Sequence, residues 1–265
     1  MYTIKKVKTD PSNSIKGLVY EIESLLYACT RDRYPSRWDR KEIDAALLDG
    51  LAGLFNNRSI HVPGNRIKTS MSVLDNTGDD ENALTGFALL VRIAFHDGQV
   101  CEGAGFLETA AKDPEKNTFS SMRKDHLRRL HSISQHARVM LYDYDSITGM
   151  AFPATPEAVI GSFPHTWDSW LPATQGAAVP ANCAMQLGQK NTGLYKTAVP
   201  FSYQLCYRYI YGLDLDYSTA ALDIARGFKT ERGNPGHLVL MTVTHGGAEE
   251  NRDFNYNGQV YSTRR

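Results

Sequence analysis

Apolar residues recur at helical spacing near the start of this chain. They stand three or four positions apart between residues 15 and 30, and again from Asp39 or Arg40 to about residue 56. This spacing places them on one side of a helix, so we predict two amphipathic helices. Two short extended pieces are expected next, over 59–74, followed by an acidic turn over 75–81.

The pattern then changes to short apolar runs separated by turn residues. Residues 87–95 form a mostly apolar run, and Asp97 and Gly98 follow it. Asp-Gly between two such runs is a strong signal for a hairpin, whose second strand we expect to end over 106–112. We predict that 87–95 and 138–144 are central strands of one sheet, because both are apolar runs of strand length bounded by polar or turn residues.

The second half of the chain is less regular. Residues 147–200 are rich in Gly, Pro, Ala and Thr and show little periodicity, so we expect strand fragments and long loops there. Strands mixed with helices indicate an α/β (or α+β) fold with a mixed central sheet flanked by helices. The other predicted elements are a helix from Ser120 or Ser121 through Gln135, short helices over 201–211 and 218–228, and a strand over 237–245.

Composition limits the classes of protein that remain. The chain has 265 residues, 42% of them hydrophobic, and a formal net charge of zero, so nucleic acid or membrane would have to be held by a local patch. The four cysteines lack paired metal-ligand spacing, which favours free thiols in a reducing cytosol. No long apolar run and no signal-peptide pattern is present, so we expect a cytoplasmic protein with no membrane partner. No G-x-x-x-x-G-K-[ST], G-x-G-x-x-G or G-x-S-x-G motif occurs, and the nucleotide-binding and α/β-hydrolase classes are unsupported.

The order helix, strands, hairpin, helix, strand resembles the restriction-endonuclease-like, or PD-(D/E)xK, nuclease fold. Thr85-Gly86-Phe87 and Ala110-Ala111-Lys112 match the frame of that family's motifs. The resemblance covers about residues 15–145 and implies acidic residues and a lysine that hold Mg²⁺ and activate water. We therefore expect a single domain over 1–265, with a core over about 15–145 and an irregular C-terminal extension over about 146–265.

The residues depart from the family's pattern at two positions. Phe87 stands where the resemblance implies an aspartate, and Ala110 stands two residues before the lysine. The acids that remain as candidate metal ligands are Glu108 and Glu81, and the candidate catalytic set is Glu108, Lys112 and Glu81. Glu108 and Lys112 would share a strand face about 13 Å apart, so only a β-bulge could bring them to one metal. The alternatives are an ion pair at a solvent-facing strand end and a solvated acidic turn.

Two basic clusters are candidates for contact with phosphates. One lies on the predicted helix after Lys112 and supplies the candidate nucleic-acid-binding residues Arg123, Lys124, Arg128 and Arg129. The other is a turn over 31–40 in which arginines are interleaved with Tyr34 and Trp38. Either cluster could neutralise phosphates, and a solvated amphipathic helix would show the same pattern.

Three functions are compatible with these observations. The first is a Mg²⁺-dependent nuclease of prokaryotic or phage type, with a role in defence. The second is the same fold with a lapsed metal site, acting as a nucleic-acid-binding subunit among other protein subunits. The third is a non-enzymatic protein-interaction or small-molecule-sensing domain whose site lies in 147–200. Phe87 and Ala110, which stand at two positions where the resemblance implies a metal ligand, argue against the nuclease. The basic helix argues mildly against the interaction or sensing domain.

Overall fold

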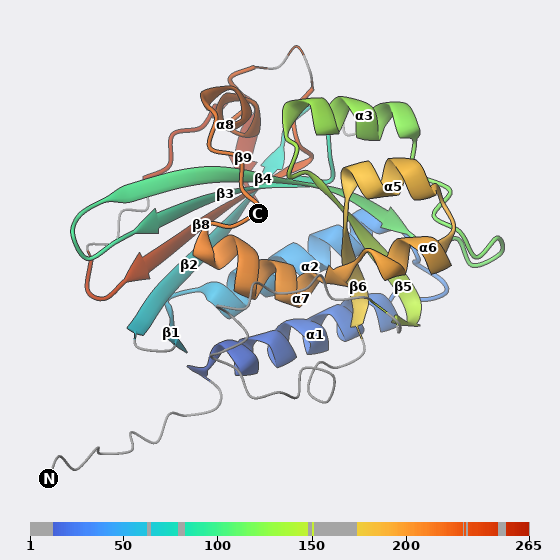
Figure 1. The fold of residues 1–265 in the computed structure, drawn as a ribbon, viewed down its shortest axis with the longest axis horizontal. Coiled ribbons are helices and arrows are strands. Elements are labelled where there is room, and N and C mark those ends of the chain that lie inside the picture. Colours follow the sequence, from blue (N-terminus) through green and yellow to red (C-terminus); the bar gives the residue numbers. More distant parts are fainter. Residues whose placement is uncertain are drawn as a thin grey trace, which may run out of the picture.

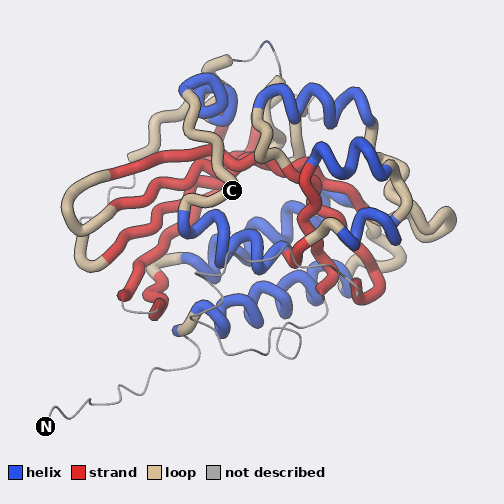
Figure 2. The backbone as a smooth tube through the Cα atoms, in the orientation of Figure 1, coloured by secondary structure: helices blue, strands red, loops and turns tan. Residues whose placement is uncertain are grey.

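The computed structural model describes residues 13–62, 65–78, 83–147, 150, 174–229, 231, 233–248 and 253–264. The chain forms three layers, with one mixed sheet between two layers of helices (Figures 1 and 2). The predicted α/β fold with a mixed central sheet flanked by helices is confirmed. The helices of the described residues are α1 (Ile15–Arg31), α2 (Arg40–Phe55), α3 (Lys124–Ile133), α5 (Ala181–Leu187), α6 (Asn191–Lys196), α7 (Phe201–Tyr203), the π-helix Gln204–Arg208, the 3₁₀-helix Tyr209–Tyr211 and α8 (Thr219–Ala225).

The sheet has nine strands and a mixed pairing pattern. Its order is β1-β2-β8-β3-β4-β5-β6-β7, and β9 pairs with β2. Strand β3 pairs antiparallel with β4 and parallel with β8, and β4 pairs parallel with β5. The strands are β1 (Arg58–Val62), β2 (Asn65–Asn76), β3 (Phe87–Ala94), β4 (Val100–Ala111), β5 (Arg138–Ile147), β6 (Thr174–Pro180), β7 (Val199–Pro200), β8 (His237–His245) and β9 (Tyr261–Thr263).

The core divides between the two faces of the sheet. The first face carries Leu89 and Val239, which pack against the apolar sides of α1 and α2. The opposite face carries Ala88 and Phe106, which pack against α3 and α8. Alternation along β4 therefore directs Leu107 toward α1 and α2 and its neighbours toward α3. This assignment decides where the polar residues at the end of β4 lie.

Most predicted elements are confirmed, including both N-terminal helices, the hairpin and its turn, and the strands over 138–144 and 237–245. The helix expected from Ser120 or Ser121 through Gln135 is shorter, because the N–H of Phe119 bonds to the carbonyl of Gln189 and holds this stretch as a turn. The prediction of only strand fragments and loops over 147–200 is wrong for 181–196, which contains α5 and α6. Strand β8 lies between β2 and β3, so the two halves of the chain build one sheet.

Candidate functional site

Two basic segments far apart in the sequence meet at the carboxylate of Glu108. Arg40, at the first position of α2, donates from Nη1 to Glu108 Oε1 at 2.8 Å and to the carbonyl of Thr109 at 3.1 Å. On the other side, His126 of α3 places Nε2 3.1 Å from Glu108 Oε2, at an angle that makes no hydrogen bond. The Glu108 side chain is only 11% exposed, so Arg40 is the main balance for its charge.

Lys112 has its own partners just beyond the end of β4. Its Nζ donates to both carboxylate oxygens of Asp143, at 3.1 and 3.0 Å. The hydroxyl of Tyr195 donates to Asp143 Oδ2 at 2.5 Å, and Lys112 Nζ lies 4.7 Å from the centre of the Tyr144 ring. The indole N–H of Trp38 donates to the carbonyl of Lys112 at 2.7 Å. Lys112 is therefore fixed in a buried, hydrogen-bonded ion pair.

The expectation that Glu108 and Lys112 face solvent at a strand end is wrong. The two residues are 8% and 5% exposed, because the start of α2 and the helices α3 and α6 cover this end of the sheet. The register of β4 on β5 runs unbroken from Leu107 to Ala111, so no bulge shortens the separation of Glu108 from Lys112 along this pairing. The structure places them on one strand end but in two separate ion pairs.

A fully buried aspartate lies on the other face of β4. Asp44 of α2 accepts a hydrogen bond from the Thr109 hydroxyl at 2.7 Å and another from the Tyr142 hydroxyl at 2.6 Å. Burial raises the pKa of Asp44 to about 7, although both hydrogen bonds and the charge of Arg40 act to lower it. Burial beside this carboxyl also raises the pKa of Tyr142 well above its usual range.

The residues at this end of the sheet do not fit the Mg²⁺ site that the resemblance implies. One Glu108 oxygen is bound by Arg40, and both oxygens of Asp143 are bound by Lys112, so a metal ion would meet positive charge at each carboxylate. Glu81 lies outside the described residues. Within the part of the chain that the structure describes, no group of three or more His, Cys, Asp or Glu residues is arranged to hold a metal ion.

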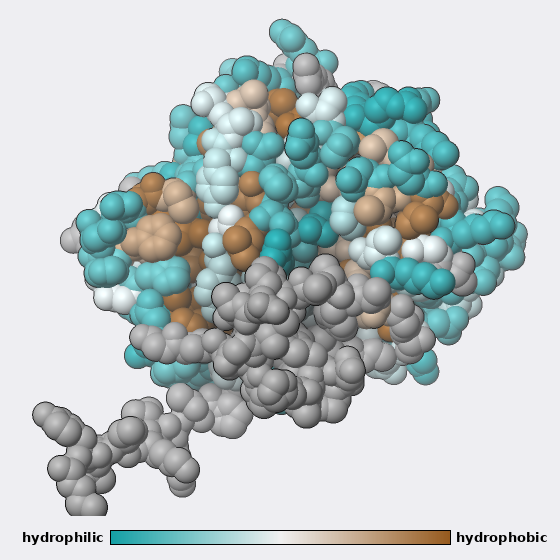
Figure 3. All heavy atoms as spheres, in the orientation of Figure 1, coloured by the Kyte–Doolittle hydropathy of each residue, from teal (hydrophilic) through white to brown (hydrophobic). Residues whose placement is uncertain are grey.

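The outer surface of α3 is basic. Lys124, Arg128 and Arg129 are exposed, and Arg123 stands at the N-cap position of the shortened helix. Arg128 pairs at the surface with Asp125 at 2.6 Å, which leaves the other three cations as the main carriers of positive charge. Figure 3 shows a hydrophilic surface over this helix. A hollow of about 330 Å³ is lined by Arg123, Asp125, His126 and Arg129.

Aromatic side chains accompany the second basic segment. Tyr34, which is 39% exposed, stacks on Tyr144 with ring centres 4.5 Å apart, and Trp38 packs edge-on against both. Arg31 and Arg37, three positions before and after Tyr34 in the sequence, are exposed. An exposed aromatic face bordered by arginines is a surface on which an unpaired base can stack.

Three residues of this region were not identified from the sequence: Asp44, Asp143 and Tyr195. Asp44 stands three and four positions before Leu47 and Leu48, on the apolar side of α2, and a charged residue there is a signal that could have been used. Asp143 directly follows the stretch of β5 that pairs with β4, where a parallel neighbour brings it beside Lys112. Tyr195 follows an irregular stretch and carries no comparable signal.

No family model, curated protein or solved structure gives a significant match to this chain. None of the helices in the described residues is long and apolar enough to cross a membrane. The sensing hypothesis depends on residues 147–200, and most of the first half of this segment lies outside the described residues. The contacts of Arg40 and His126 with Glu108 are therefore the main structural basis for the proposed function.

Proposed function

We propose that this chain binds nucleic acid, single-stranded segments in particular, without metal-dependent cleavage at Glu108. The contact surface, which we call the basic surface, consists of two parts. One is the turn that carries Arg31, Tyr34 and Arg37, and the other is the start of α3 with its exposed cations. The residues of the basic surface are Arg31, Tyr34, Arg37, Arg123, Lys124, Arg128 and Arg129.

The observation that carries this proposal is the contact of both segments with Glu108. Arg40 is the last residue of the basic segment 31–40, and His126 lies one helical turn from Arg123 and Arg129. Two clusters that are about 90 positions apart in the sequence thus each bring a residue to one carboxylate. Several cations on one region release counterions when they bind a phosphate backbone, although the whole chain has no net charge.

The stacked aromatics favour single strands over duplexes. A base of a single strand can leave its neighbours and stack on Tyr34, whereas a paired base cannot do so without unpairing. The state of Glu108 supports binding without catalysis, because a metal-ligating carboxylate must offer its oxygens to the ion, and Arg40 already binds one of them. The resemblance to the nuclease fold stays a prediction.

The experiment compares two double variants by fluorescence anisotropy on a labelled single-stranded oligonucleotide across a salt series. Arg123→Ala with Arg129→Ala removes two cations from the basic surface. Binding should weaken for all sequences alike, and the slope of log K against log salt should fall by about 0.7 for each phosphate that the variant no longer neutralises. The control is Arg66→Ala with Lys68→Ala, two exposed cations at the start of β2, where Lys68 pairs with Thr244 near the end of β8.

The control variant should bind with the affinity and the salt slope of the wild-type protein. If both double variants lose affinity equally, the interaction is a general attraction and the basic surface is not where the strand binds. If the wild-type protein does not bind oligonucleotides at low salt, the proposal is wrong.

A further inference from the structure

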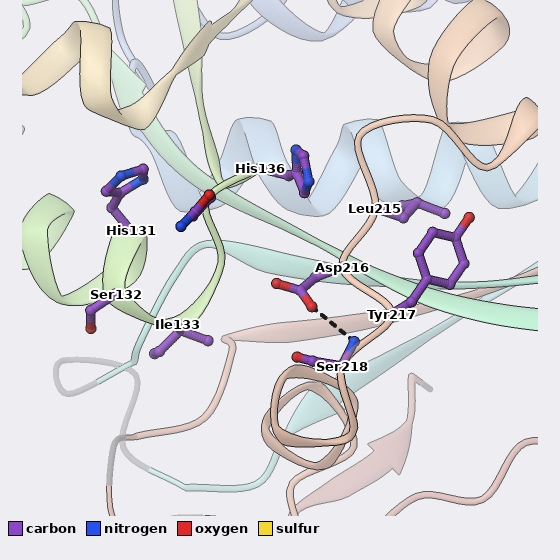
Figure 4. A pocket seen from close by; sticks show the side chains of 9 residues that line it. His131, Ser132, Ile133, His136, Leu215, Asp216, Tyr217 and Ser218 are labelled. Carbon is purple, nitrogen blue, oxygen red and sulfur yellow. Dashed lines mark hydrogen bonds between the residues drawn. The ribbon is translucent and has the colours of Figure 1, made fainter.

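A cavity lies at the opposite end of α3 from Arg123. It has a volume of about 590 Å³ and is formed between the C-terminal turn of α3 and the segment before α8. Figure 4 shows His131 and Ile133 on one wall, His136 above, and Leu215 and Asp216 on the facing segment. This volume lies in the range of small-molecule sites in proteins, and most of the residues that line it are polar.

Asp216 is a rigidly held acceptor in this cavity. Its backbone N–H and carbonyl both bond to Ala104 of β4, at 2.8 and 2.9 Å, so the sheet fixes its position. Its Oδ1 accepts from the N–H of Ser218 at 2.9 Å, as Figure 4 shows, and no described residue donates to Oδ2. A carboxylate can accept about four hydrogen bonds, so Asp216 retains capacity on both oxygens for a ligand with N–H groups.

His131 lines the same cavity, but its Nδ1 atom is closed off from solvent and has no hydrogen-bond partner among the described residues. That nitrogen therefore does not face the open space of the cavity. The polar group that the cavity offers in a fixed position is the Asp216 carboxylate, and Ile133 and Leu215 are among the apolar side chains that line it.

Helix α3 connects this cavity to the basic surface. Arg129 lines the hollow at the start of the helix, and Ser132, three residues later, lines the cavity at its end. Three residues span about 4.5 Å along a helix axis. A strand whose phosphates contact Arg123 and Arg129 can therefore place a neighbouring base in the cavity.

We propose that this cavity binds a guanine base. The proposal rests on the proposed function when the base belongs to a nucleic acid strand. Guanine is the base whose Watson–Crick edge presents two adjacent N–H donors, N1–H and the N2 amine, and a carboxylate accepts two parallel N–H bonds in the same plane. Thymine offers one such donor between two carbonyls, and adenine and cytosine offer an amine beside a ring acceptor that the carboxylate repels. The same chemistry fits a free guanine nucleotide, and the test distinguishes the two sources.

The experiment uses the full chain and twelve-residue deoxythymidine oligonucleotides that carry one central thymine, guanine or hypoxanthine. Wild-type protein should bind the guanine oligonucleotide at least about fivefold more tightly than the all-thymine one, the low end of discrimination by a bidentate pair. Hypoxanthine lacks the N2 amine and should lose most of that preference. Asp216→Asn keeps an acceptor for the Ser218 N–H but places an NH₂ toward the base, so it should abolish the guanine preference, measured as the ratio of the affinities for the guanine and all-thymine oligonucleotides.

The matched control is Asp97→Asn in the β3–β4 turn, whose Oδ1 accepts from the N–H of Gln99 in the same way. It should preserve the preference. Equal wild-type affinity for guanine and thymine oligonucleotides, or a preference that survives Asp216→Asn, would overturn the base pocket while the proposed function stands. If no oligonucleotide binds, the binding of guanosine monophosphate to the wild-type protein and to Asp216→Asn is measured instead. Saturable binding that Asp216→Asn abolishes supports the pocket with a free nucleotide, and its absence refutes it.

Discussion

Lys112 and Asp143 form a buried ion pair where the pairing of two parallel strands ends. The Lys112 ammonium donates to both carboxylate oxygens, and the two side chains are 6% and 3% exposed. Each residue directly follows the last paired position of β4 on β5, and α6 supplies the Tyr195 hydroxyl as a further donor. A lysine held in this way has a structural role, because its donors are directed to fixed acceptors and its charge is balanced.

The first prediction concerns the stability that this pair provides. Lys112→Ala should lower the free energy of unfolding by about 3–5 kcal/mol, because it leaves the Asp143 carboxylate buried without its cation. Urea unfolding at neutral pH, followed by circular dichroism, measures the change. Lys116→Ala is the control, since Lys116 lies 3.6 Å from Asp113 at the surface and such pairs contribute about 0–1 kcal/mol. Equal losses in the two variants would contradict a structural role for Lys112.

The arrangement of the strands shows which features of the fold could be predicted from the sequence and which could not. The run from His237 to His245 was predicted as a strand with the bounds that β8 has, because its residues are apolar, β-branched and closed by polar ends. Its place between β2 and β3 could not be predicted, because pairing depends on contacts between residues about 150 positions apart. Helices α5 and α6 have seven and six residues, too short for a period of 3.6 to become visible.

The second prediction concerns pH. Because burial raises the pKa of Asp44 to about 7 from its usual value of 3.8, the folded protein binds a proton between these values that the unfolded chain does not. The free energy of unfolding should therefore fall as pH rises from about 4 to about 7, and this part of the stability is lost above pH 7. Glu23, whose pKa burial also raises to about 7, acts in the same direction.

Asp44→Asn should remove one of these two contributions. The amide stays neutral at all pH values and can still accept from the Tyr142 hydroxyl, while the Thr109 hydroxyl can accept instead of donate. Urea titrations at pH 4.5, 6 and 8 should show a shallower decline for this variant than for the wild-type protein, and a shallower one again when Glu23→Gln is added. An unchanged decline in Asp44→Asn would mean that this carboxyl is ionised throughout the range.

The third prediction concerns the exposed aromatic face of the basic surface. Tyr34→Ala should weaken binding of single-stranded oligonucleotides by about 1–3 kcal/mol, the range measured for one base stacked on an aromatic ring, and should affect duplex binding less. Anisotropy with matched single and double strands measures both. Tyr20→Ala is the control, because Tyr20 is 40% exposed, close to the 39% of Tyr34, but lies in the first half of α1. A similar loss in both variants would remove Tyr34 from the contact surface.

The candidate site was only partly predictable. Sequence spacing placed Glu108 and Lys112 on one face of a strand, and the two basic clusters were identified as separate features. What could not be deduced is that Arg40 and His126 would approach Glu108 from two different helices, because this depends on how α2 and α3 cover the end of β4. The same covering explains why residues expected at the surface are buried.

The fourth prediction separates binding from cleavage at Glu108. In the proposed function this buried carboxylate contacts Arg40 and His126 next to the basic surface and reduces the positive potential there, so Glu108→Gln should raise the affinity for nucleic acid. The salt slope should also steepen, by up to about one unit, because the Arg40 charge is no longer balanced. The glutamine carbonyl can still accept from Arg40, which limits the cost in stability. In the nuclease hypothesis the same variant should instead abolish cleavage, because a metal ligand is removed.

The assay incubates wild-type and variant protein with single- and double-stranded DNA and RNA, with Mg²⁺, Mn²⁺ or EDTA, and measures binding in parallel. Tighter binding by the variant with no metal-dependent cleavage by either protein supports the proposed function. Wild-type cleavage that needs metal and disappears in Glu108→Gln would establish the nuclease instead.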